Sequence, residues 1–133
     1  MDQASPAPRA TAPHDDLKAA AFIQRWHGVS ASELSTAQSF VRELCALLDV
    51  AVPHPTPGQN YMFERPITFN HGNGSTSPGR IDCYRRGHFV LESKKIKAGP
   101  QTKGFDDALM RARAQAESYV RALPPAEGRP PFL

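Results

Sequence analysis

Apolar side chains recur with helical spacing in three stretches of the chain. The first predicted helix covers residues 17–26, and the aspartate pair just before it provides an N-cap. The second follows a cap at Ser30 or Ser32, runs to about Asp49 and shows the clearest helical period of the three. The third runs from about Phe105 to a pair of prolines at positions 124–125, which stops it. Its inner side is expected to hold Leu109, Ala112, Ala116, Val120 and Leu123.

Three strands are predicted between the second and third helices. Residues 61–69 alternate between apolar and polar side chains, and Pro66 among them indicates an edge strand or a bulge. Residues 70–75 form a turn, and residues 80–84 and 88–95 are the two arms of a hairpin. The apolar run FVL in the second arm is typical of a central strand. We therefore expect an α/β or α+β fold with a three-stranded mixed sheet.

The length of 133 residues suits a single small domain. Residues 1–16 are rich in proline and alanine and are expected to be a disordered tail. Residues 17–133 would form the domain, with a helical part at 17–58 and a core at 59–123. No apolar run approaches the roughly 20 residues of a membrane span. The two cysteines follow no disulfide or zinc pattern, which is typical of a reducing compartment. We therefore expect a cytoplasmic protein, and the lack of a long apolar run predicts no membrane partner.

The candidate metal-binding and catalytic residues lie mainly in the hairpin. Asp82 stands in its first arm, and Glu92 and Lys94 stand in its second. A three-residue loop at 85–87 would place Asp82 opposite Val90, on the same face as Glu92 and diagonal to it, with the two backbones about 7–8 Å apart. A two-residue loop would send the carboxylates to opposite faces. In the first register the two acids can share one Mg²⁺.

Basic residues cluster around these acids. The whole chain carries a formal charge of +3, but the stretch from Arg80 to Lys103 is much richer in cations. Clustered cations beside a metal site favour a DNA backbone as the ligand, although charged residues also protect exposed sheet edges. The candidate DNA-binding residues are Arg80, Arg85, Arg86, Lys95 and Lys97.

The spacing of Asp82 from Glu92-Ser93-Lys94 is similar to the PD-(D/E)XK nuclease motif. This resemblance implies that Asp82, Glu92 and the Ser93 carbonyl bind Mg²⁺ or Mn²⁺, and that Lys94 activates the attacking water. Gln115 and Tyr119 look like the Gln-x-x-x-Tyr element of RecB-like members, and they share a helix face because they are four residues apart. An ordinary amphipathic helix would also contain such a pair.

Residues 22–55 resemble the N-terminal region of the MmeI-type enzymes, and the resemblance extends over about residues 17–133. These type IIL restriction–modification proteins join a nuclease to an adenine-specific DNA methyltransferase that uses S-adenosylmethionine. The resemblance implies a metal-dependent DNA endonuclease domain that acts on double-stranded DNA beside the remaining domains of a parent enzyme. It also implies Glu33 as an assisting acid, and a further core strand that would begin at Phe132–Leu133, so that this strand would be truncated here.

Two other interpretations remain open at the level of sequence. The chain could be a non-catalytic DNA-binding or assembly module of a DNA methyltransferase that has kept the fold. It could also be a small interaction protein in which Glu92 and Lys94 form an ordinary ion pair. A structure with Asp82 and Glu92 on different faces of the sheet would favour the interaction protein over both the endonuclease and the DNA-binding module.

Overall fold

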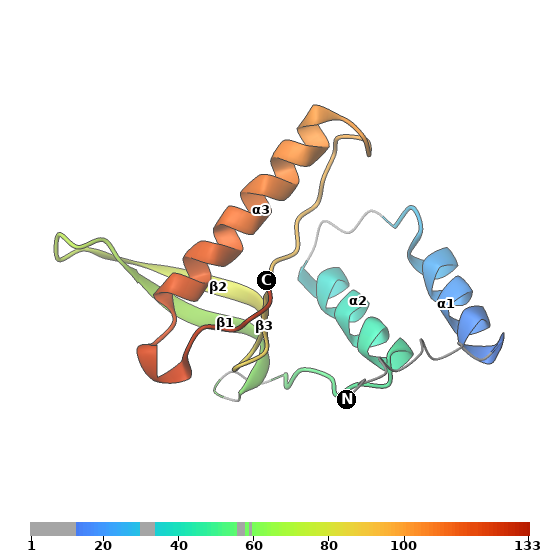
Figure 1. Cartoon of the computed structure of the whole chain (residues 1–133), viewed down its shortest axis with the longest axis horizontal. Helices are drawn as coiled ribbons and strands as arrows, with labels where there is room; N and C mark the ends of the chain where they lie inside the picture. Colours follow the sequence, from blue (N-terminus) through green and yellow to red (C-terminus); the bar gives the residue numbers. More distant parts are fainter. Residues whose placement is uncertain (1–12, 30–33, 56–57, 59) are drawn as a thin grey trace, which may run out of the picture.

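An antiparallel sheet packed between helices forms the α+β fold of this chain (Figure 1). The computed structural model describes residues 13–29, 34–55, 58 and 60–133. In chain order the elements in these ranges are α1 (Pro13–Trp26), α2 (Leu34–Leu47), β1 (Tyr61–Asn70), β2 (Thr76–Arg85), β3 (Phe89–Leu91), α3 (Lys103–Ala122) and a 3₁₀ turn (Pro125–Glu127).

The two N-terminal helices are confirmed, with shifted ends. α1 begins at Pro13, earlier than predicted, because proline is well accommodated in the first turn of a helix. Residues 13–16 are therefore helical and not part of a tail, while residues 1–12 lie outside the described ranges. α2 ends at Leu47 and not at Asp49, which has a left-handed φ of 53°. Its predicted caps, Ser30 and Ser32, lie outside the described ranges.

The third helix is capped by Thr102, whose hydroxyl accepts a hydrogen bond from the Phe105 N–H at 3.2 Å. Its C-terminal half packs on the sheet, where Ala116 and Tyr119 are buried. Its N-terminal half extends beyond the sheet (Figure 1). The prediction that Leu109 lies on the inner side is therefore wrong, because its side chain is 48% exposed.

The strand order is β1-β2-β3, and both pairs are antiparallel. The mixed sheet predicted from sequence is therefore wrong. β1 is an edge strand, as Pro66 indicated. β3 is also an edge strand and covers only residues 89–91 of the predicted 88–95. Its apolar run comes from the covering of both its faces and not from a central place in the sheet, because Val90 is enclosed under α3 while Phe89 and Leu91 pack against the α2 cluster.

The end of the chain returns to the outer edge of β3. Phe132 forms an isolated parallel bridge with Phe89. The Val90 N–H donates to the Phe132 carbonyl at 3.1 Å, and the Phe132 N–H donates to the His88 carbonyl at 3.3 Å. This bridge lies where the sequence resemblance placed the start of a further core strand.

The two faces of the sheet carry different helices. Met62, Tyr84 and Val90 contact α3 in one apolar cluster. Their chain neighbours Phe63, Cys83 and Leu91 point to the opposite face and pack with Val41 and Cys45 of α2. The sheet is therefore the middle layer between α3 and α2.

α1 packs against α2 rather than on the sheet. The rings of Phe22 and Trp26 lie 5.4 and 5.3 Å from the Phe40 ring, and the Trp26 indole N–H donates to Glu43 at 2.6 Å. Figure 1 shows the two helices side by side, next to the sheet. Among the described residues, no helix is long and apolar enough to cross a bilayer.

Candidate functional site

The hairpin brings Asp82 and Glu92 close together. Tyr84 pairs with Val90 and Arg85 with Phe89, so the loop is residues 86–88, with Gly87 at φ 72°. The predicted loop at 85–87 is therefore displaced by one residue, and the pairing differs by two. In a regular ladder this even shift would keep the two acids on one face, but the alternation does not continue unbroken to Asp82, because the β1–β2 ladder is interrupted there. The last pair of the hairpin is Cys83 with Leu91, and Asp82 and Glu92 are the next residues along the two chains.

The ladder between β1 and β2 is interrupted where Asp82 lies. Pairs are formed on both sides of this point, by Phe63 with Cys83 and by Arg65 with Ile81, but Glu64 and Asp82 form none. Glu64 has a left-handed φ of 51°. The interruption changes which face the side chains point to, because Ile81 and Tyr84 contact the same α3 cluster although they are three positions apart. Asp82 can therefore line the α2 side of the sheet together with Cys83.

Glu92 is a buried carboxylate with one engaged oxygen. Its side chain is 6% exposed, and the Lys94 ammonium lies 3.4 Å from Oε1. Oε2 has no hydrogen-bond partner among the described residues. Burial, together with the Asp82 carboxylate, raises the pKa of Glu92 to about 7, and Lys94 opposes this rise. The site therefore contains a buried carboxylate oxygen that forms no hydrogen bond within the described part of the chain.

Asp82 is fixed by the chain that leaves β3. Its Oδ2 accepts a hydrogen bond from the Ser93 N–H at 2.8 Å. It also borders a cavity of about 10 Å³, which holds at most one water molecule. Gln38 of α2 lines the same cavity, and no sequence pattern singled out this residue. The carboxylate is thus held against the backbone of the Glu92-Ser93-Lys94 segment.

These oxygens suit a hard divalent cation. Mg²⁺ is typically held by one or two carboxylates and completes its shell with water and substrate phosphate. Asp82, the unpaired oxygen of Glu92 and the Ser93 carbonyl match this donor set in chemistry. No group of three or more His, Cys, Asp or Glu side chains suited to a metal occurs in the described ranges. A metal bound entirely by protein side chains of these kinds is therefore not formed there.

The pair on α3 lies in the core of the opposite face. Tyr119 is 6% exposed, and its ring stacks on Phe69 with centroids 5.8 Å apart. The Gln115 side-chain N–H donates to the Tyr119 hydroxyl at 2.6 Å. The structure therefore brings Gln115 and Tyr119 together, and their contacts are with α3 and β1. Glu33 lies outside the described residues.

The candidate DNA-binding residues differ in how they are held. Arg80 is 70% exposed and lies 3.3 Å from Glu64. Arg85 lies over the Tyr61 ring at 4.9 Å, and Arg86 donates to the Ala126 carbonyl at 2.9 Å. Two further cations, Lys95 and Lys97, are exposed on the segment that follows β3. The cations therefore spread from the hairpin loop to the chain beside α3.

A buried polar cluster on the α3 face was not predicted from sequence. Arg65 forms an ion pair with Glu127 at 2.6 Å, and both side chains are 16% exposed. The Tyr84 hydroxyl donates to the other oxygen of Glu127 at 3.0 Å. This cluster fastens the C-terminal turn to the sheet. It joins residues 62 positions apart, and no local pattern indicates such a contact.

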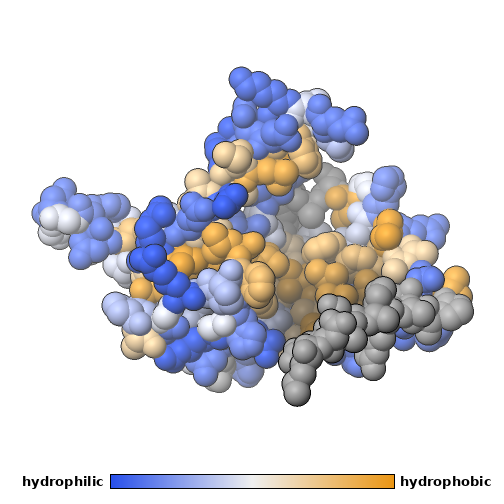
Figure 2. All heavy atoms as spheres, viewed as in Figure 1, coloured by the Kyte–Doolittle hydropathy of each residue, from blue (hydrophilic) through white to orange (hydrophobic). Residues whose placement is uncertain are grey.

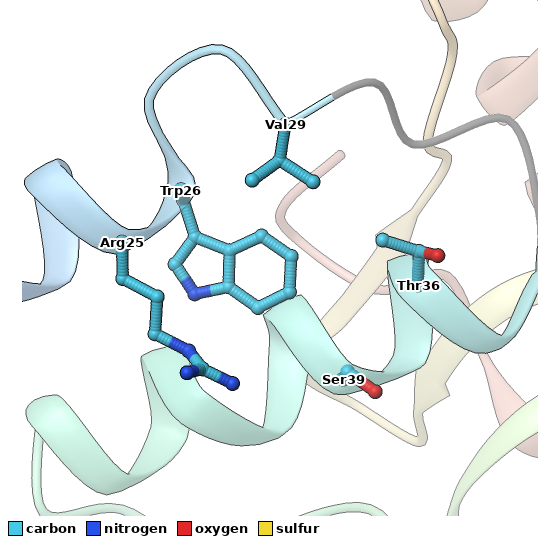
Figure 3. Close-up of a pocket in the computed structure, with 5 residues that line it drawn as sticks. All are labelled: Arg25, Trp26, Val29, Thr36 and Ser39. Atoms are coloured by element: carbon cyan, nitrogen blue, oxygen red, sulfur yellow. The ribbon is translucent and has the colours of Figure 1, made fainter.

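A separate hollow lies between the end of α1 and the start of α2 (Figure 3). It has a volume of about 420 Å³ and is lined by Arg25, Trp26, Val29, Thr36 and Ser39. None of these residues lines the cavity beside Asp82.

Comparison with known families agrees with the sequence resemblance. The family model described as "MmeI, N-terminal domain" matches residues 17–133, which is nearly the whole of the described chain. The name of this family associates the domain with restriction–modification enzymes. No curated protein and no solved structure matches the chain significantly. On the match over residues 17–133, the chain belongs to the MmeI N-terminal domain family.

Proposed function

We propose that this chain is the Mg²⁺-dependent DNA endonuclease domain of a restriction–modification enzyme. The observation that supports the proposal best is the buried Glu92 carboxylate beside the carboxylate of Asp82. Glu92 is held with one oxygen unpaired, beside Asp82 and within 3.4 Å of Lys94. Such a pair is costly to keep unless a cation or a proton occupies the site.

The proposed roles follow from the contacts of each residue. Asp82, Glu92 and the Ser93 carbonyl would hold Mg²⁺, with Mn²⁺ as a substitute. When bound, the metal would supply a nucleophile and neutralise charge on the phosphate. The Lys94 ammonium would orient the attacking water, because it is anchored beside Glu92 and still 41% exposed. Arg80, Arg85, Arg86, Lys95 and Lys97 would contact the DNA backbone, which gives affinity without sequence preference.

Gln115 and Tyr119 have a different role in this proposal. Tyr119 is buried against Phe69, and its hydroxyl is engaged by Gln115. We propose that the pair supports the docking of α3 on the sheet and does not contact the phosphate. A Tyr119→Phe variant is then expected to nick DNA within about threefold of the wild-type rate. The lost hydroxyl does not contact the phosphate in this proposal, and the loss of one hydrogen bond lowers the stability of the fold by only about 1 kcal/mol.

The proposed setting is a larger enzyme. The family name describes an N-terminal domain, so the remaining domains of a parent protein would be its partners. We propose that these include an adenine-specific DNA methyltransferase, and S-adenosylmethionine would bind there. Target choice would belong to those domains, because the cations near the carboxylates can read only the charge of the backbone.

The proposal is tested by nicking of supercoiled plasmid DNA in Mg²⁺. Asp82→Asn removes the charge but keeps an oxygen that can accept from the Ser93 N–H. Asp82→Asn and Lys94→Gln are each expected to slow nicking by about 100-fold or more. The exposed α3 residues Asp106 and Lys103 supply matched controls, Asp106→Asn and Lys103→Gln. If Asp82→Asn and Lys94→Gln have unchanged melting temperatures and nick at the wild-type rate, the proposal is wrong.

A second candidate function is a non-catalytic DNA-binding or assembly module. The observation in its favour is that the described ranges contain no cluster of three or more acidic, histidine or cysteine ligands. Calorimetry separates the two functions. A nuclease domain should take up one Mg²⁺ or Mn²⁺, and Asp82→Asn should abolish this uptake. A chain that binds DNA but takes up neither metal specifically would be a module.

A further inference from the structure

The β1–β2 hairpin continues beyond the body of the protein as a narrow arm. Figure 1 shows this arm projecting away from α2 and α3. The arm comprises residues 66–80, of which Ile67 and Phe69 still pack against the α3 cluster, and its two strands remain paired out to Asn70 and Thr76. One of its faces is exposed along the whole length and consists of Pro66, Thr68, Asn70, Thr76, Pro78 and Arg80.

The tip of the arm is held by its own side chains. Asn70 Oδ1 accepts from the Gly72 N–H at 3.1 Å, and Asn73 Oδ1 accepts from the Ser75 N–H at 3.0 Å. Across the two strands, His71 Nε2 lies 2.9 Å from the Ser77 hydroxyl. The arm is therefore built as a defined ribbon up to its end.

The inner face of the arm is anchored to α3 through Phe69, near the outer end of β1. The Phe69 ring lies over Gly79, where an added Cβ would approach the ring to 2.6 Å. The Phe69 ring also stacks on the Tyr119 ring of α3. A glycine is therefore required at position 79, and the contact fixes the direction of the arm relative to the sheet that carries Asp82.

The charge of the arm suits a polyanion. From Arg65 to Ile81 the sequence contains no aspartate or glutamate, whereas hydroxyl and amide groups are frequent and His71 adds one imidazole. Arg80 at the base is 70% exposed. Figure 2 shows the projecting arm as predominantly hydrophilic. The arm therefore offers hydrogen-bonding groups without a negative charge that would repel phosphate.

The width of the arm determines which groove of DNA it can enter. Paired strands lie about 4.8 Å apart, and a two-stranded ribbon with its side chains fits the major groove, which is about 12 Å wide. The minor groove, at about 6 Å, is too narrow. We propose that the arm enters the major groove of duplex DNA, beside the phosphate that a metal held by Asp82 and Glu92 would contact. This inference rests on the proposed function.

The arm and the carboxylates would contact separate parts of one duplex. Thr76 precedes Asp82 by six residues on the same strand, so about 20 Å separates them. One turn of B-DNA extends about 34–36 Å. The arm would therefore contact bases roughly half a turn from the phosphate at Asp82, and it would orient the duplex on the proposed catalytic site.

Charge substitutions on the exposed face test the arm. The full chain is titrated into a fluorescein-labelled 30-base-pair duplex in Ca²⁺, which limits cleavage. The Thr68→Glu/Thr76→Glu variant is expected to weaken binding about tenfold or more, and Thr68→Lys/Thr76→Lys should strengthen it. The control Ala21→Glu/Gln24→Glu carries the same charge change on exposed positions of α1 and should weaken binding by less than about threefold.

Dimethyl sulfate footprinting identifies the groove, because the reagent modifies guanine N7 in the major groove. Wild-type protein should protect guanines, and Thr68→Glu/Thr76→Glu should lose this protection. Equal weakening by the arm and control variants, absent guanine protection, or a wild-type chain that binds no duplex would each overturn the proposal. Unchanged DNA affinity would assign the arm to another class of partner.

The plasmid assay keeps the two proposals separate. If Asp82→Asn abolishes nicking but the arm variants bind DNA normally, only the arm proposal fails. If the arm variants lose binding while Asp82→Asn nicks normally, the endonuclease proposal fails and the arm remains a DNA contact.

Discussion

The Glu92 carboxyl group is buried, and one of its oxygens has no hydrogen-bond partner among the described residues. Its ordinary pKa of 4.5 is raised to about 7, first by burial and then by Asp82. Below about pH 4.5 this group is protonated in both the folded and the unfolded chain. As pH rises to about 7, the folded chain keeps a proton that the unfolded chain has lost, so the stability that this group contributes at low pH disappears. In the absence of metal, ionised Glu92 therefore destabilises the fold.

Glu92→Gln should reverse this effect. In EDTA at pH 8 we expect the variant to melt roughly 3 °C or more above the wild type, because a neutral amide replaces a buried charge. At pH 4.5 the difference should shrink or vanish. Glu117→Gln is the matched control, since Glu117 is 41% exposed and pairs only with Arg113 on its own helix. Melting curves at the two pH values measure the effect, and a pH-independent difference for Glu92→Gln would contradict it.

At the scale of elements, the C-terminal turn is joined to the sheet by polar contacts. Glu127 binds both Arg65 of β1 and Tyr84 of β2. The Arg65 guanidinium also lies 5.3 Å from the Tyr84 ring, and its Nε has no partner among the described residues. Arg65 therefore depends strongly on Glu127 for compensation of its buried charge.

Glu127→Ala is expected to lower the free energy of unfolding by about 2–4 kcal/mol, because it leaves a largely buried cation unpaired. Glu117→Ala breaks an exposed pair between residues four apart, and should cost no more than about 0.5 kcal/mol. Urea denaturation followed by circular dichroism measures both values. Equal losses in the two variants would show that the buried cluster contributes little.

At the scale of the whole molecule, the chain divides into a compact α3–sheet–α2 body and a peripheral α1. Tyr84, Ile81, Val90 and Cys83 are fully buried at the centre of the body. α1 packs through Phe22 and Trp26 on α2, and its other apolar residues Leu17 and Ile23 are 71% and 63% exposed. An element with few buried contacts opens at a lower free energy than the core.

The single tryptophan reports on this peripheral contact. We expect Trp26 fluorescence to change at a lower urea concentration than the far-ultraviolet circular dichroism of the body, because detaching α1 leaves the sheet intact. Phe40→Ala removes the ring that Trp26 and Phe22 contact, and it should move the fluorescence transition more than the dichroism transition. Coincident transitions in the wild type would show instead that the chain unfolds as one cooperative unit.

The sequence alone determined the number and order of the main elements, the edge position of β1 and the family of the chain. These properties depend on local periodicity, on proline chemistry and on motif spacing, which are all visible along the chain. The sequence also predicted that Asp82 and Glu92 lie close together, and the Asp82 carboxylate does help to raise the pKa of Glu92, although the predicted register was wrong by two residues.

Only the tertiary structure decided how these acids are held. The position of the hairpin loop brings the two acids together just beyond the last pair of the hairpin, and Asp82 accepts a hydrogen bond from the Ser93 backbone where the β1–β2 ladder is interrupted. The burial of Glu92 and the bond between Arg65 and Glu127 arise from segments distant in the chain. The antiparallel pairing and the projecting arm also depend on which strands meet. Such contacts are fixed by the packing of remote elements, for which a local pattern carries no signal.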